Sequence, residues 1–302
     1  MDTGAAGAKA AVASLGGGAN AINIATTEDL GGGLRGGTNF QMRFNAANGD
    51  VNSHGTGNAL FHEANVFVSG GFGTVRMGKI AEASNCTFDA WGCTGGAGFG
   101  AGVGTSTLIG AAAQANSVSY ATRTINGFSA GFQSSVTSRA EERTAMNIAY
   151  AKGPIAAQFL QTKSSVNTAA NGTTHTTALL ATNPITDVKG QGTSIAASYN
   201  FGVAKLNVVN AKTENAAGAV TADITGVNAS MPMGAYTLLA GYAKDKKALA
   251  TADTKVSVGV SYALSKRTTL GADLFKAEGQ TAVAPATGTS GTGFVIRARH
   301  TF

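Results

Sequence analysis

Strict alternation of apolar and polar residues is the feature of this chain that most limits its fold. In residues 292–302, Phe294 and Ile296 fall at even positions, while Arg297 and Arg299 fall at odd positions. Successive side chains of a strand point to opposite faces, so the pattern predicts one apolar face and one cationic or polar face. No segment shows the period of a helix that could cover such a face. The chain is therefore predicted to be all-β, a transmembrane antiparallel β-barrel with lipid outside and water inside.

The same alternation recurs along the whole chain, with a second face that is small or polar in nearly every case. The segments are 22–25, 40–45, 118–123, 145–150, 195–201, 204–208, 236–242 and 256–262. Short connections such as Gly70–Gly73 alternate with longer ones, among which we count Ala81–Ala115, Ser138–Glu142 and Thr213–Thr221. Such alternation is expected when turns of one kind lie at one rim, and it predicts about sixteen strands. Residues 1–302 are expected to form a single domain.

The beginning of the sequence does not supply a complete first strand. Met1–Gly4 lacks the basic start and apolar core of a secretory signal. It is also shorter than the roughly 9 residues that a membrane-crossing strand needs. We therefore expect a truncated first strand, unless Gly4–Val12 takes part in closing the barrel.

Composition excludes several other classes of protein. The apolar runs fall short of the roughly 18 residues that suggest a membrane helix. The chain has 42 glycines and 4 prolines, which suits many strands joined by tight turns better than disordered linkers. The formal net charge is +6, but the basic residues are scattered, so a nucleic-acid partner is not expected. A weak preference for anions moving through a pore is more consistent with this charge.

Two cysteines and four histidines are the residues that suggest special chemistry. Cys86 and Cys93 are close enough for a disulfide in an oxidising compartment, and two free thiols are the alternative. The histidines show no metal-ligand spacing, and Gly95–Gly104 has no phosphate-binding context. No nucleophile, base and orienting acid come together, so we expect no enzyme activity, no cofactor and no metal.

Several short stretches resemble the general trimeric porins of Gram-negative outer membranes, especially their beta-proteobacterial branch. The matching stretches are Thr27–Leu34, Ser69–Lys79, Asn116–Tyr120, Gly127–Ala130, Tyr262–Thr268 and Arg299–Phe302. The resemblance implies a sixteen-stranded barrel, a homotrimer in the outer membrane, and passive diffusion of small hydrophilic solutes and ions. It also implies contact with lipid and lipopolysaccharide, and insertion by the barrel-assembly machinery with Phe302 as the C-terminal signal.

The resemblance further implies a constriction, in which the third long loop folds into the lumen. That loop corresponds to Ala81–Ala115 and carries Glu82 and Asp89, which would face basic groups on the wall. Lys79 matches the family's basic residue there, and it can share the lumen with Arg76 only if Gly78 forms a bulge.

Alternation indicates which other basic residues face the lumen. It points Arg43 and Arg123 toward the constriction, and Arg297 and Arg299 toward the lumen from the terminal strand. Glu82 and Asp89 have a plainer interpretation as solvated loop charges, and Arg297 and Arg299 as rim contacts. The family often has arginine where Ala25 and Ser119 stand, which predicts a thinner basic ladder.

Two other functions fit part of the pattern. A secreted structural or adhesive β-protein without channel activity would have a similar composition, but it predicts a fixed repeat and uniform connections. A substrate-specific channel on the same scaffold would call for an aromatic slide or a dense arginine ladder, and neither is evident.

Overall fold

The computed structural model shows one large antiparallel sheet in which fifteen strands follow each other in chain order. It describes residues 20–44, 60–84, 86–91, 113–138, 141–165, 175–176, 184–185, 189–215, 217–246, 253–278 and 291–301. The strands of the sheet are β1 (Asn20–Gly31), β2 (Leu34–Phe44), β3 (Phe61–Gly70), β4 (Gly73–Ala81), β5 (Ala113–Ala121), β6 (Phe128–Ser138), β7 (Glu141–Lys152), β8 (Ile155–Ser165), β11 (Lys189–Asn200), β12 (Lys205–Asn215), β13 (Val220–Met233), β14 (Tyr236–Asp245), β15 (Asp253–Ala263), β16 (Thr268–Glu278) and β17 (Gly291–His300). A separate short pair joins β9 (His175–Thr176) to β10 (Pro184–Ile185), and η1 (Cys86–Phe88) is a single 3-10 turn.

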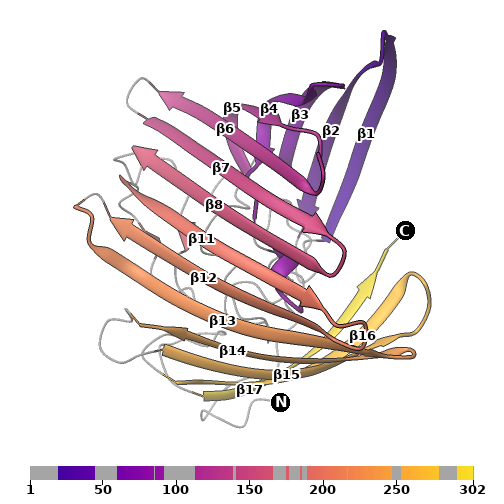
Figure 1. Cartoon of the computed structure of the whole chain (residues 1–302), viewed down its shortest axis with the longest axis vertical. Coiled ribbons are helices and arrows are strands. Elements are labelled where there is room, and N and C mark those ends of the chain that lie inside the picture. The colour runs from indigo at the N-terminus through magenta and orange to yellow at the C-terminus, as the bar shows by residue number, and fades with distance from the viewer. Residues whose placement is uncertain are drawn as a thin grey trace.

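The sheet curls around a central space, as Figure 1 shows, with strands lying side by side in sequence order. The predicted antiparallel barrel architecture is therefore confirmed. Within the described residues β1 and β17 are the two edges of the sheet and do not pair, so the barrel is open. The sequence predicts about one strand more, and its expected place before Asn20 lies outside the described residues. The described residues contain no helix long and apolar enough to cross a membrane.

The two faces of the sheet differ as the alternation predicts. On β17, the side chain of Ile296 is 76% exposed on the outer face, whereas Arg297 on the other face pairs with Asp273 of β16. On β12, Val208 is 43% exposed and its neighbour Asn207 only 1%. Apolar residues thus face the surroundings and polar residues face the enclosed space, the reverse of a water-soluble sheet.

Aromatic side chains mark one rim of the barrel. Ring pairs lie beside the short turns, with centroids 4.7 Å apart for Phe128 and Tyr150, and 4.8 Å apart for Tyr236 and Tyr262. The Tyr120 hydroxyl donates to the Phe72 carbonyl at 2.6 Å at the same rim. Tyrosine and phenylalanine in such a ring occupy the boundary between hydrocarbon and water. The rim of short turns therefore lies at one membrane surface.

Connection lengths depart from the expected pattern at two places. The connection predicted as long at Ser138–Glu142 is short, because β6 ends at Ser138 and β7 begins at Glu141. The one predicted at Thr213–Thr221 is also short, because β12 runs to Asn215 and β13 starts at Val220. In both cases the paired strands extend further toward the rim than the alternation indicated. Longer connections remain after β2, β4, β8, β14 and β16.

Candidate pore constriction

The segment Glu82–Trp91, which follows β4, crosses to the far inner wall of the sheet. Its turn η1 packs against β11 and β12. Asn228 of β13 holds it by donating to the Phe88 carbonyl at 3.0 Å and accepting from the Ala90 amide at 2.8 Å. Asn207 donates to the same Asn228 oxygen at 2.7 Å. We call Glu82–Trp91 the inward segment.

The wall that receives the inward segment combines buried apolar side chains with buried polar ones. Inner-face residues of β8 and β11–β16 are buried, with Leu160, Val209 and Ile224 each 0% exposed. Phe88 of the inward segment packs with Val209 and Ala196, and Trp91 packs with Leu239. Burying apolar surface on both partners stabilises the contact. The inward segment therefore fills part of the lumen on this side.

Trp91 forms the main anchor of the inward segment. Its side chain is 4% exposed, and its Nε1 donates to Oδ1 of Asp273 at 3.0 Å. The ring lies over Gly241 and Gly259 of the wall, where a Cβ on Gly241 would stand 3.0 Å from Trp91 Cζ3. A side chain at Gly241 would therefore press against the indole, and a large one would occupy its space. Asp273 is in turn held by Arg297, whose Nη2 donates to Oδ1 at 2.8 Å and whose Nε donates to Oδ2.

The acidic residues expected at the constriction are both buried and both accept hydrogen bonds. Arg143 of β7 donates from Nε and Nη2 to the two carboxylate oxygens of Glu82, whose side chain is 1% exposed. Asp89 accepts from the Trp91 amide at 2.9 Å. Burial raises the pKa of Asp89, while the Trp91 amide and the charges of Lys255 and Arg297 oppose that rise. Arg143 thus compensates the charge of Glu82, and both acids lie away from solvent.

The basic residues expected at the constriction lie apart from these acids. Arg43 donates from Nε to Oε1 of Gln41 at 2.6 Å on the polar inner face of β2. Lys79 donates from Nζ to the Phe61 carbonyl at 2.9 Å, next to an irregular register between Gly78 and Ile80. Arg123 follows the end of β5 and lies at the short-turn rim, whereas the inward segment begins at the other end of β4.

Arg143, Lys255 and Asp273 are site residues that the sequence reasoning did not single out. A signal was present for Arg143, because extending the alternation of Ala145 and Asn147 by one step places it on the inner face. The same extension from Ser257 reaches Lys255, which is 1% exposed and lies 5.4 Å above the Phe275 ring. Arg299 occupies the next inner position after Arg297 and is exposed.

Two further predictions fall outside the described residues. Cys93 and Phe302 are not described, nor is the side chain of Cys86. The disulfide and the C-terminal assembly signal therefore stay predictions.

Comparison with known proteins gives consistent matches along nearly the whole chain. Residues 1–281 match the model of the Gram-negative porin family. Outer membrane porin protein 32 of Delftia acidovorans is 27% identical over 315 residues, covering 93% of this chain and 84% of that protein.

Solved structures share the fold. An anion-selective porin from Comamonas acidovorans superposes with a TM-score of 0.72 at 23% identity, covering 95% of this chain and 90% of that one. In-vitro folded OmpT, an outer membrane protein of Vibrio cholerae, gives a TM-score of 0.69 at 17% identity, covering 94% and 90%.

Proposed function

The chain belongs to the Gram-negative porin family, and from this premise we propose that its pore favours small anions. It is an outer-membrane protein that forms a general diffusion channel for small hydrophilic solutes and ions. Family members are channels rather than enzymes. The preference for anions depends on the charged side chains that line the pore.

The pairing of the acidic side chains is the observation that carries the proposal. Glu82 is bound by Arg143, and Asp273 is bound by Arg297. Arg43 has its Nε hydrogen bond to the neutral amide of Gln41 instead, although Glu63 stands opposite Gln41 on β3. A net positive charge on a pore wall raises the local concentration of anions. The formal net charge of +6 and the anion selectivity of the Comamonas porin support the same conclusion.

Replacing Arg43 with glutamine tests the proposal, with Arg43→Lys as the charge-conserving partner. Removing one charge several ångströms from an ion path in water should lower the chloride-to-potassium permeability ratio about twofold to threefold. Arg43→Lys should keep most of the ratio. The measurement is the reversal potential in a potassium chloride gradient across a planar bilayer. Lys244→Gln, on the outer face of β14, serves as the control, and an equal effect there would refute the role of Arg43.

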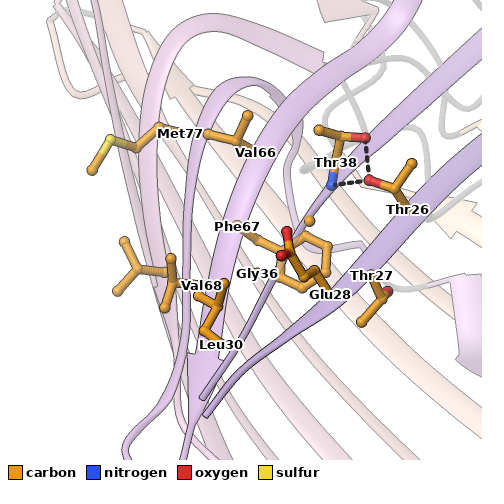
Figure 2. A pocket seen from close by; sticks show the side chains of 12 residues that line it. Thr26, Thr27, Glu28, Leu30, Gly36, Thr38, Val66, Phe67, Val68 and Met77 are labelled. Carbon is orange, nitrogen blue, oxygen red and sulfur yellow. Dashed lines mark hydrogen bonds between the residues drawn. The ribbon is translucent and has the colours of Figure 1, made fainter.

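We further propose that the protein assembles as a homotrimer through the outer face of β1–β4. This face carries a hollow of about 540 Å³, lined in part by Glu28, Leu30 and Met77 (Figure 2). Thr26 and Thr38 are hydrogen bonded beside it at 2.8 Å. A carboxylate and paired hydroxyls on a lipid-facing surface are unfavourable, and a second copy of the chain would cover them.

Matched outward substitutions test this interface. Val66 at the hollow and Val258 on β15 are exposed to 53% and 51%, so arginine at either site meets a comparable environment in the monomer. Val66→Arg should reduce the trimer to monomers in native mass spectrometry of detergent-solubilised protein, because the larger side chain would obstruct the contact between copies. Val258→Arg should leave the trimer intact. Equal assembly of both variants would contradict the assignment of this face.

A further inference from the structure

Arg123 lies in a polar hollow at the short-turn rim, away from the inward segment. The hollow has a volume of about 430 Å³. Its lining residues are Asp29, Gly33, Leu34, Arg35, Ser69, Gly70, Gly73, Thr74, Thr122 and Arg123.

The register of the sheet explains why polar groups converge in this hollow. Arg35 of β2 pairs with Ser69 of β3, and Ser69 pairs with Thr74 of β4. Paired residues share a face, and Arg35 shares its face with Arg43 because the two are an even number of positions apart on β2. Neighbouring strands lie about 4.8 Å apart, so Arg35 and Thr74 are separated by roughly 10 Å at the backbone. The row faces the lumen.

The hollow contains several groups that can donate hydrogen bonds to an anion. Within the described residues, neither Arg35 nor Arg123 has an ion-pair partner. Asp29, the one carboxylate among the lining residues, lies opposite Arg35 in the register of β1 and β2 and accepts from the Gly31 amide at 2.9 Å. The Thr122 hydroxyl oxygen accepts from the Ala130 amide at 2.9 Å, which leaves its hydrogen available to donate.

We propose that this hollow is a binding site for small tetrahedral oxyanions such as inorganic phosphate and sulfate. Guanidinium groups recognise such anions through paired, charge-assisted hydrogen bonds, and nearby hydroxyls donate to the remaining oxygens. The ion comes from solution rather than from a phospholipid headgroup, because the row faces the lumen. On the opposite, outer face of the same turn, Leu30 is 51% exposed. The proposal rests on the anion-conducting channel and places in it a second anion-binding site, separate from Arg43.

The test is equilibrium dialysis of radiolabelled sulfate against detergent-solubilised trimer or monomer in potassium chloride. The wild-type protein should bind sulfate in competition with excess chloride. The variant Arg35→Gln/Arg123→Gln should lose about tenfold or more in affinity, because two charge-assisted contacts are removed. Arg76→Gln/Arg299→Gln removes the same charge from inner-face positions outside the hollow and should keep the sulfate affinity.

Three results would overturn the proposal. The proposed site is refuted if the wild type does not bind sulfate. It is also refuted if both double variants bind sulfate equally weakly. Loss of a co-purifying phospholipid in the Arg35→Gln/Arg123→Gln variant, with unchanged sulfate binding, would reassign the hollow to a lipid headgroup. The chloride reversal potential of the same samples separates the two accounts. If the pore prefers anions but binds no sulfate, only the oxyanion site is refuted. If the pore shows no anion preference, the proposed function is refuted.

Discussion

Replacing Gly241 with leucine is expected to push Trp91 off the inner wall and to turn a steady channel into a fluctuating one. A Cβ at Gly241 already stands 3.0 Å from Cζ3 of Trp91, so the rest of a leucine side chain would occupy the space of the indole. Losing the buried tryptophan contact should weaken the anchoring of the inward segment by about 3–5 kcal/mol. The hydrogen bond from Trp91 to Asp273 would be lost with it.

The protein reports on this anchor directly, because Trp91 is its single tryptophan. The Gly241→Leu variant should show emission at longer wavelength and stronger quenching by iodide, together with current fluctuations in single-channel recordings. Ala240→Leu, the neighbouring outward position on β14, provides the control and should change neither. Unchanged Trp91 emission in Gly241→Leu would show that the indole does not sit on this wall.

Replacing Arg143 with glutamine is expected to destabilise the folded protein by about 3–5 kcal/mol, because a buried charge loses its partner. The side chains of Glu82 and Arg143 are only 1% and 10% exposed, and both carboxylate oxygens accept from the guanidinium. The reverse change, Glu82→Gln, should cost less, since the more exposed Arg143 can turn toward water. It should also strengthen anion preference by releasing a cationic group.

A double-mutant cycle separates the pair from its surroundings. Glu82→Gln/Arg143→Gln removes both charges and should regain much of the stability lost in Arg143→Gln. Unfolding in urea, followed by circular dichroism, gives the free energies. The exposed pair Lys212–Glu214, 3.2 Å apart at the rim, is the control, and Lys212→Gln should change stability little. Additive effects of Glu82→Gln and Arg143→Gln would mean that the two residues do not interact.

Side-chain alternation predicted the fold class and which face most of the strand residues take. It placed Arg43 and Arg297 on the inner face, where the structure has them in contact with Gln41 and Asp273. The same rule was available for Arg143 and Lys255, one step before the segments that were recognised. Alternation is reliable here because the repeat of two residues is fixed by strand geometry.

Alternation loses its meaning where a strand ends or its register breaks. The expectation for Arg123 extended the pattern past Ala121, the last residue of β5, and the structure instead brings Arg123 to the short-turn rim. Lys79 follows Gly78, whose φ of 131° interrupts the regular pleat. The residues that contact the inward segment depend on which strands it packs against. That choice depends on the glycines of β14 and β15 and on wall residues such as Leu239 and Asn228, which are distant in sequence.

The reversal potential of the wild-type protein in a tenfold potassium chloride gradient tests whether the protein forms a water-filled pore that prefers anions. A water-filled pore whose wall carries a net positive charge predicts that the dilute side becomes negative, because chloride crosses faster than potassium. The value should stay below the roughly 59 mV of a perfectly selective pore, since both ions pass. A positive dilute side, or a folded protein that passes no current, would contradict the account.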